Sequence, residues 1–329
     1  MNREYKIEPF VLLGDRLQGL IGSDLIAKAC LENEWFTSDD IEYAINVLRT
    51  TLLDRSELTA LLSRHKITNP SRDVCLVMAG NIPFAGLYDM VCVLSCGHRC
   101  FVKLSSKDKV LMQFVIDTLM EIDSSLPIYT LGQLDSCDAL IFSGSDAAAE
   151  IYRSRYNVAE TIARTSRFSV AVLDGNETQE DLEGLSDDLF RYFGLGCRNV
   201  SMVFVPQEYD ISKLSALGTK QIKEHTGFIN NSRAVRALRF MEGVQVVDCD
   251  GFIMSEGCAP SNYIAELKYV RYDDISSVEK FLSDNENKIQ CVVSNMDIHA
   301  CGCSFGRAQR PEVTDFADGI DVVEFLSRI

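Results

Sequence analysis

The sequence from residue 73 reads DVCLVMAG (73–80), RCFVKLS (99–105), DALIFSG (138–144) and FSVAVLDG (168–175) at successive intervals. Apolar residues fill consecutive positions within each run, which is typical of strands buried on both faces. The stretches near Tyr88, over 108–122 and over 145–153 carry their apolar residues at helical spacing instead. This alternation predicts parallel βαβ units with right-handed crossovers, and hence an α/β lobe of the nucleotide-binding type.

Segments of the same two kinds continue from about residue 181. The expected strands are SMVFVP (201–206), ELKYVRY (266–272) and KIQCVVS (288–294), and the expected helices cover 209–242 and 274–284. Upstream, residues 39–64 repeat apolar side chains at three- and four-residue steps. We therefore predict an N-terminal helical cap followed by two α/β lobes.

The composition describes an ordinary globular protein, with 47% hydrophobic and 24% charged residues in 329. A net charge of -16 argues against a nucleic-acid surface but leaves room for a local anion site. MNREYKIEPF lacks the features of a signal peptide, and no apolar run reaches the roughly 20 residues of a membrane span. Twelve scattered cysteines indicate reduced thiols. We therefore expect a cytoplasmic protein.

The two common phosphate-binding fingerprints, GxxxxGK[ST] and GxGxxG, are absent from the sequence. Three other polar segments follow expected strands and precede expected helices, namely GNIP (80–83), KLSSKD (103–108) and FSGSD (142–146). Open parallel sheets bind ligands where their strands end. These segments are therefore the candidate coenzyme site.

In this order, GNIP, KLSSKD, FSGS and FGLGCRNVS (193–201) resemble the signatures of the aldehyde-dehydrogenase superfamily. VKLSSKD, GCRNVS and the ending FGRAQRPEVTDFADGIDVVEFL (305–326) are similar, more closely, to the acyl-CoA reductases of bacterial luminescence (LuxC type). The resemblance covers about residues 70–329, and its specificity lies in the combination. It implies an aldehyde-dehydrogenase-like fold, with a dinucleotide-binding lobe and a catalytic lobe.

Cys197 is the candidate nucleophile, because the small residues of GLG before it let a turn bring the thiol to a cleft. Arg198 beside it would favour the thiolate. The resemblance implies that the Asn81 side-chain amide and the Cys197 backbone N–H stabilise the negative charge on the thioester oxygen. The competing interpretations are a buried, inert cysteine and an asparagine that caps the following helix.

The resemblance also implies a coenzyme site at Lys103, Ser105, Ser106, Gly144 and Ser145. NAD-using relatives commonly carry at the position of Ser106 a glutamate that binds the ribose hydroxyls and would repel a 2′-phosphate. Serine beside Lys103 and Lys107 removes that repulsion and offers hydrogen-bond donors, which favours NADPH. Gly144 and Ser145 match the superfamily's phosphate-contacting turn. The competing interpretations are solvated lysines and a plain helix start.

Several departures from the superfamily pattern bear on the reaction. Aldehyde oxidisers carry ELGGK, whose glutamate activates water, whereas this chain has VLDGNE with Asp174. An enzyme without that base would spare an acyl-enzyme from hydrolysis, which favours reduction. Glu266 lies near the superfamily's second glutamate without aligning with it, and His225 is either a site residue or a polar helix end. We expect no metal site, because HACGC (299–303) lacks structural zinc spacing.

We therefore predict an NADPH-dependent acyl-CoA reductase. It would have a helical cap and coenzyme domain at 1–172, a catalytic domain at 173–310, and a C-terminal segment at 311–329. DVVEFLSRI (321–329) is expected to form a strand that joins its own sheet or a homo-oligomer. Partners implied by the resemblance are acyl-CoA or an acyl-protein and an acyl-protein synthetase. The alternatives are an NADP-dependent aldehyde dehydrogenase, an acyl-phosphate reductase, a non-catalytic acyl-binding scaffold and a zinc-binding module.

Overall fold

The computed structural model describes residues 6–67, 69–133, 136–144, 146–156, 158, 160–298 and 302–329. They form two compact units. Unit 1 consists of residues 1–166 together with 311–329, and unit 2 of residues 167–310. The first division thus lies between Ser166 and Arg167, where the sequence suggested one after Val172. The C-terminal segment belongs to unit 1.

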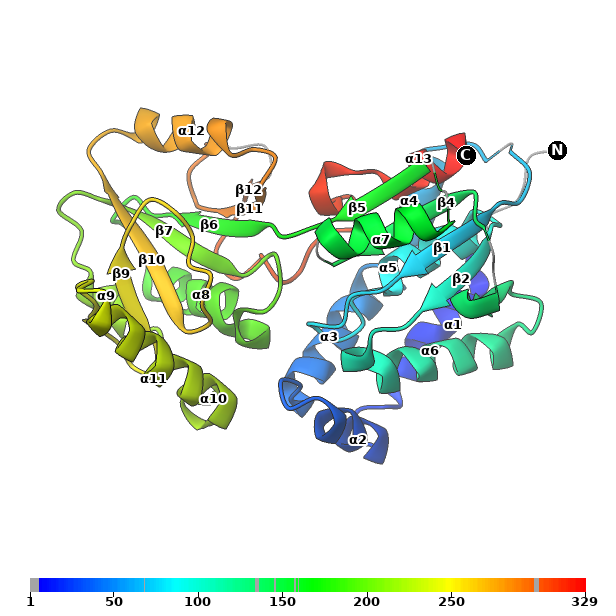
Figure 1. Ribbon diagram of the computed structural model, residues 1–329, viewed down its shortest axis with the longest axis horizontal. Coiled ribbons are helices and arrows are strands. Elements are labelled where there is room, and N and C mark those ends of the chain that lie inside the picture. The colour runs from blue at the N-terminus through cyan, green and yellow to red at the C-terminus, as the bar shows by residue number, and fades with distance from the viewer. Residues whose placement is uncertain are drawn as a thin grey trace. The chain divides into compact units, whose positions relative to one another are not determined.

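Unit 1 contains a parallel sheet whose described strands follow the order β3-β2-β1-β4-β5 (Figure 1). Their bounds are β1 Asp73–Val77, β2 Arg99–Lys103, β3 Ile128–Thr130, β4 Ala139–Ser143 and β5 Glu160–Arg164. β1, β2 and β4 confirm the sequence prediction. β3 and β5 were not predicted, because these edge strands are short or polar and largely escape burial.

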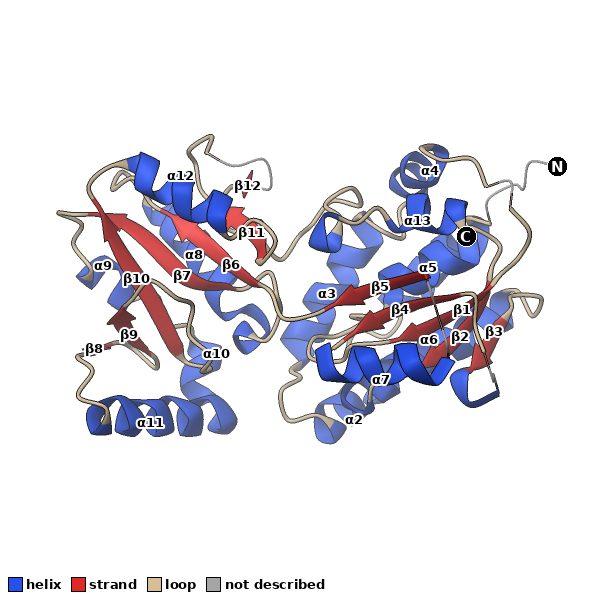
Figure 2. Ribbon diagram, turned by 45° about the horizontal axis from the view of Figure 1, so that its top comes forward, coloured by secondary structure: helices blue, strands red, loops and turns tan. Residues whose placement is uncertain are grey.

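Eight α-helices of unit 1 lie among the described residues: α1 Glu8–Gln18, α2 Asp24–Glu32, α3 Ser38–Thr50, α4 Arg55–Ser63, α5 Leu87–Ser95, α6 Lys109–Ile122, α7 Asp146–Tyr156 and α13 Val322–Arg328. Figure 2 shows α5 and α7 on opposite sides of the sheet. The helical stretch predicted over 39–64 is divided into α3 and α4. Asp54 causes the restart, because its side chain accepts hydrogen bonds from the backbone N–H groups of Ser56 and Glu57.

The prediction of a terminal strand at 321–329 is wrong, because this segment is helix α13. Asp321 caps the helix by accepting a hydrogen bond from the Glu324 backbone N–H. Four apolar residues are buried at helical spacing, namely Val322, Val323, Phe325 and Leu326. Asn69 then binds the last turn, since its amide donates to the carbonyl groups of Ser327 and Ile329.

Unit 2 contains a second sheet, whose described strands follow the order β12-β11-β6-β7-β10-β9-β8 (Figure 1). Their bounds are β6 Phe168–Val172, β7 Val200–Pro206, β8 Val247–Asp248, β9 Ile253–Glu256, β10 Glu266–Tyr272, β11 Ile289–Val293 and β12 Gly302–Cys303. All neighbours pair in parallel except β8 with β9. β6 lies between β11 and β7, so the run at 168–175 continues this sheet rather than the first one.

The described α-helices of unit 2 are α8 Gln179–Phe190, α9 Ser212–Ser215, α10 Lys220–Glu224, α11 Thr226–Met241 and α12 Ile275–Asp284. Figure 2 shows α8 and α12 on opposite faces of the sheet. The helical region predicted at 209–242 is therefore three helices, and α12 confirms the prediction at 274–284. Val278 and Leu282 of α12 pack into the core against β6, β7 and β11. Within the described ranges, no helix combines the length and apolar character needed to cross a bilayer.

Candidate functional site

Cys197 lies in the turn 195–199, directly before β7, with its side chain exposed. Among the described cysteines, only Cys258 shares that exposure. Val200, the first residue of β7, pairs with Ser169 of β6, so the turn lies at the edge where these parallel strands begin. Cys197 is therefore not a buried cysteine.

The backbone before the turn is held in an unusual conformation. Tyr192, Phe193 and Gly194 have φ values of 54°, 57° and 74°. The left-handed region costs about 1–2 kcal/mol for each residue with a side chain, so tertiary packing must hold it. The Phe193 ring is 1% exposed and lies 4.2 Å from the His225 ring and 6.2 Å from the Phe228 ring. Aromatic packing thus stabilises the bend that leads to Cys197.

Asn199 is the residue that fixes the turn itself. Its side chain is buried, and its amide nitrogen donates to the carbonyl oxygens of Asp188 at 3.1 Å and Arg191 at 2.9 Å. Its amide oxygen accepts a hydrogen bond from the Gly196 backbone N–H at 2.8 Å. On the other side, the Ser169 hydroxyl donates to the Cys197 carbonyl at 2.9 Å. The thiol is therefore carried on a backbone held from two sides.

The Arg198 side chain makes contacts that the sequence did not predict. Its Nε donates to the Ala308 carbonyl at 2.5 Å, and its Nη2 lies 3.7 Å from the Cys291 sulfur. Asp188 accepts hydrogen bonds from the backbone N–H groups of Gly306 and Ala308 at 2.7 and 2.9 Å. Burial raises the pKa of Asp188 to about 7. These contacts fasten the FGRAQR segment to the turn that carries Cys197.

Asp174 lies at the opposite edge of the same sheet. It follows the last residue of β6, whereas Cys197 precedes the first residue of β7, its parallel neighbour. The five residue-to-residue steps from Ser169 to Asp174 span roughly 16 Å of extended chain. Asp174 instead accepts a hydrogen bond from the Asn176 backbone N–H at 2.8 Å, which contributes most to lowering its pKa. It is not placed to activate water near Cys197.

His225 and Glu266 both have structural contacts in unit 2. His225 caps α11, since its Nδ1 accepts a hydrogen bond from the Phe228 backbone N–H at 3.1 Å. The Glu266 side chain is fully buried and forms ion pairs with Arg239 and Lys268. His225 is therefore a polar residue at the start of a helix, and Glu266 is held within buried ion pairs.

The candidate oxyanion donor Asn81 and the described candidate coenzyme residues lie at the carboxyl edge of the sheet of unit 1. Asn81 follows β1, Lys103 ends β2 and Gly144 follows β4, and these three strands are neighbours. The chain runs outward to β2 and β3 on one side of β1 and to β4 and β5 on the other. Ligands of open parallel sheets bind at such a switch point. Ser145 lies outside the described residues.

The loops after β1 and β2 pack unusually closely. A Cβ atom on Gly80 would lie 2.4 Å from the Ser105 hydroxyl oxygen and 2.6 Å from its Cβ, so only glycine fits here. Ser105 is half-buried and caps the short helix at 106–108 by accepting a hydrogen bond from the Lys107 backbone N–H. Lys103 and Ser106 are exposed. The exposed hydrogen-bond donors of Lys103 and Ser106 fit a phosphate-bearing coenzyme.

Asp108 joins these two loops, and the sequence analysis missed this role. Its side chain is 1% exposed, and its Oδ2 accepts a hydrogen bond from the Phe84 backbone N–H at 2.8 Å. Phe84 has a φ of 59°, so this bond helps to hold a left-handed backbone. The Oδ1 atom is buried without a hydrogen-bond partner among the described residues. Burial raises the pKa of Asp108 to about 8.

The side chains of HACGC are only partly described, because His299 and Cys301 lie outside the described residues. The Cys303 sulfur lies 3.3 Å from the Cys291 sulfur on the neighbouring strand. In the described ranges, no group of three or more metal-binding side chains converges.

The acyl-CoA reductase (LuxC) family matches residues 45–224, more than half of the chain. No curated protein sequence matches. Aldehyde dehydrogenase 21 from Physcomitrella patens, solved with succinate, is a structural match at 11% identity and a TM-score of 0.70, covering 98% of this chain and 83% of that one. An indole-3-acetaldehyde dehydrogenase complexed with NAD+ matches at 13% identity and 0.64, covering 92% and 74%.

A third structural match carries the phosphorylated coenzyme. The NADP-dependent glyceraldehyde-3-phosphate dehydrogenase from Bacillus halodurans, complexed with NADP, matches at 12% identity and a TM-score of 0.58, covering 88% of this chain and 73% of that one. At these identities the likeness concerns the fold. It confirms the predicted aldehyde-dehydrogenase-like fold class.

Asp108 generates a prediction about stability and pH. Its ordinary pKa is 3.8, so raising it to about 8 makes the folded state bind a proton more tightly than the unfolded chain. The associated stability is fully present below about pH 4 and is lost as pH rises through about 8, by up to about 1.4 kcal/mol per unit. Asp108→Asn should therefore lose less unfolding free energy than wild type between pH 5 and 8, as measured by urea denaturation.

Asp210→Asn is the matched control, because Asp210 is exposed and its pKa is lowered, chiefly by a hydrogen bond from the Ser212 side chain. It should keep the wild-type pH dependence over this range. Equal losses in Asp108→Asn and wild type would contradict the assignment of Asp108.

Proposed function

We propose, since the chain belongs to the acyl-CoA reductase (LuxC) family, that it reduces an acyl thioester to the aldehyde with NADPH through an acyl-enzyme on Cys197. Family and fold make the chain an oxidoreductase that forms or oxidises an aldehyde. The observation that carries the finer proposal is the exposed thiol on a turn held by Asn199 and Ser169. A nucleophile held in one orientation avoids the entropy cost of being positioned at each turnover.

Covalent catalysis by Cys197 divides the reaction into two steps. The Cys197 thiolate attacks the thioester carbonyl carbon, and the bond from that carbon to the coenzyme A sulfur breaks. Coenzyme A leaves as a thiolate and takes up a proton. When bound, NADPH would supply the hydride for the second step. The bond between the former acyl carbon and the Cys197 sulfur then breaks. This step releases the aldehyde and regenerates the Cys197 thiolate.

The placement of Asp174 supports reduction rather than oxidation of an aldehyde. Oxidation needs water to hydrolyse the acyl-enzyme, and a carboxylate commonly activates that water. The Asp174 carboxylate lies at the far edge of the sheet from Cys197. An acyl group on Cys197 would therefore persist until hydride arrives.

Cys197→Ala should form no acyl adduct and should lose NADPH-dependent reduction, because the substitution removes the attacking thiolate. Intact-mass measurement after mixing with acyl-CoA and the rate of NADPH oxidation test this. Cys30→Ala, which removes a half-buried thiol of α2 in unit 1, should keep both the adduct and the rate. Wild-type reduction by Cys197→Ala would refute the covalent mechanism.

We assign Asn81 the role of donor to the thioester oxygen, a role that rests on the family resemblance and on its position after β1. Removing one oxyanion donor typically costs about 10²–10³ in rate. Asn81→Ala should therefore slow Cys197 acylation by that factor, measured by rapid quench and mass. Asn176→Ala, in the loop after β6, is the control and should acylate normally. Wild-type acylation by Asn81→Ala would remove this residue from the mechanism.

We assign Lys103, Ser105, Ser106, Gly144 and Ser145 to coenzyme binding. The support is the carboxyl-edge position of the described members and the exposed donors of Lys103 and Ser106. Ser106→Glu would place a carboxylate where a 2′-phosphate is expected. Its kcat/KM for NADPH should fall and that for NADH should not, so NADH serves as the control within the same variant. An unchanged NADPH to NADH ratio would contradict this assignment.

The donor and the direction of the reaction are separated by comparing initial rates. Acyl-CoA or acyl-protein with NADPH should react faster than acyl phosphate with NADPH or an aldehyde with NADP+. A faster rate with either of the last two would replace the proposal by an acyl-phosphate reductase or an aldehyde dehydrogenase. Absence of an adduct with every donor would indicate a non-catalytic scaffold.

A further inference from the structure

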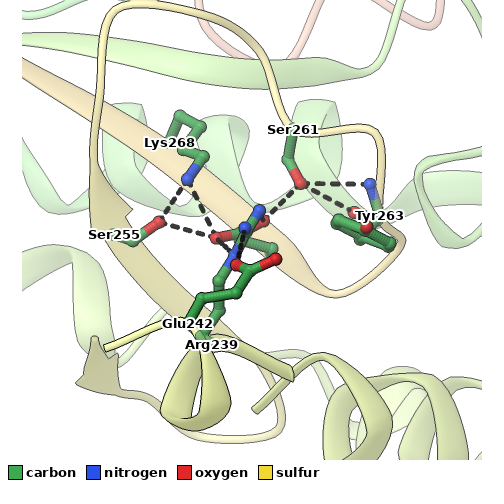
Figure 3. Close-up of polar contacts among 7 residues, drawn as sticks. Arg239, Glu242, Ser255, Ser261, Tyr263 and Lys268 are labelled. Atoms are coloured by element: carbon green, nitrogen blue, oxygen red, sulfur yellow. Dashed lines mark hydrogen bonds and ion pairs between the residues drawn. The ribbon is translucent and has the colours of Figure 1, made fainter. Parts of the chain in front are cut away.

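Unit 2 contains a buried charged cluster centred on Glu266, the first residue of β10. Its partners Arg239, Ser255, Ser261 and Lys268 are labelled in Figure 3. Its Oε1 accepts hydrogen bonds from Arg239 Nε at 2.8 Å, Ser255 Oγ at 2.6 Å and Lys268 Nζ at 3.0 Å. Its Oε2 accepts hydrogen bonds from Arg239 Nη2 at 2.7 Å and Ser261 Oγ at 2.5 Å. Both carboxylate oxygens are therefore fully engaged within the protein.

The cluster keeps Glu266 ionised despite burial. Burial raises the pKa of this carboxyl, but the hydrogen bonds from Arg239, Ser255, Ser261 and Lys268 outweigh it and hold the pKa at about 2. The Glu266 side chain is 0% exposed. A buried charge is retained only where such partners compensate its lost hydration. The carboxylate therefore acts on its neighbours rather than on a ligand.

The cluster lies at the same sheet edge as Cys197. β10 pairs in parallel with β7, with Lys268 opposite Met202. Two residues earlier on each strand, Glu266 comes level with Val200, the residue that follows the Cys197 turn. The loop 257–265 and the turn 195–199 therefore enter neighbouring strands, whose spacing is about 4.8 Å.

Ser261 connects that loop to the carboxylate. Its hydroxyl donates to Glu266 and accepts a hydrogen bond from the Tyr263 backbone N–H at 3.0 Å, as Figure 3 shows. The Tyr263 ring lies 5.2 Å from the Arg239 guanidinium and is 43% exposed. Ala265, at the end of the loop, has a φ of 70°. The shape of the loop thus depends on Glu266 through Ser261 and Arg239.

We propose that Glu266 is a positioning residue for acyl transfer. It holds the loop 257–265 so that the loop forms one wall of the space that the acyl group on Cys197 occupies. The exposed ring of Tyr263 and the neighbouring Ala259 and Pro260 offer apolar surface suited to an acyl chain. This inference rests on the proposed function, because it requires that Cys197 carry an acyl group.

Ser261→Ala separates the loop from the carboxylate while leaving the ion pairs of Glu266 with Arg239 and Lys268 in place. Glu266→Gln keeps the size of the side chain and removes its charge. The control is Glu242→Gln, which removes the exposed partner of Arg239 without touching the loop. Each protein is mixed with a short and a long acyl-CoA. Single-turnover acylation of Cys197 is followed by intact mass, beside thermal unfolding.

Ser261→Ala should unfold close to the wild-type temperature, acylate about tenfold more slowly or worse, and change the ratio of the long-chain rate to the short-chain rate. Glu266→Gln should show at least the same rate loss per folded molecule, and Glu242→Gln should match wild type. Wild-type acylation and chain-length dependence in Ser261→Ala would overturn the positioning role while the proposed function stands. Failure of wild type to form an adduct would overturn both.

Discussion

Parallel strand pairing decides which loops of each unit lie at the same edge of its sheet. It delivers all segments that enter the strands to one edge of a sheet and all segments that leave them to the other. In unit 1, Asn81, Lys103 and Gly144 are distant in the sequence but all lie at the carboxyl edge of the sheet, where the strands end. In unit 2, the Cys197 turn and the loop 257–265 lie at the edge where β7 and β10 begin. Asp174 follows β6 and lies at the opposite edge.

Buried polar side chains then hold the loops at these edges in defined conformations. Asn199 ties the Cys197 turn to the end of α8, Asp108 ties the loop after β1 to that after β2, and Glu266 ties the loop 257–265 to α11. Each of the three is almost fully buried, and each binds backbone or side chains of segments that precede or follow strands. Buried hydrogen bonds of this kind are costly to break, so they favour one loop conformation.

Much of the fold could be predicted from the sequence, because strands buried on both faces leave continuous apolar runs such as those of β1 and β4. The same signal could not show which sheet a run joins, so FSVAVLDG was grouped with the first lobe. The order of the motifs along the chain identifies Cys197 and the coenzyme segments as candidates. Asn199 and Asp108 were overlooked although both lie inside quoted motifs, because a buried polar anchor and an exposed polar residue look alike in sequence.

We expect an acyl group on Cys197 to persist until hydride reduces it, without loss to water. Intact-mass measurement of the enzyme loaded with a fatty acyl-CoA, first alone and then after addition of NADPH, distinguishes these two fates. An adduct on Cys197 should persist in buffer and disappear with NADPH as one equivalent of aldehyde forms. Spontaneous loss of the adduct to the free fatty acid, with no aldehyde on addition of NADPH, would contradict this expectation.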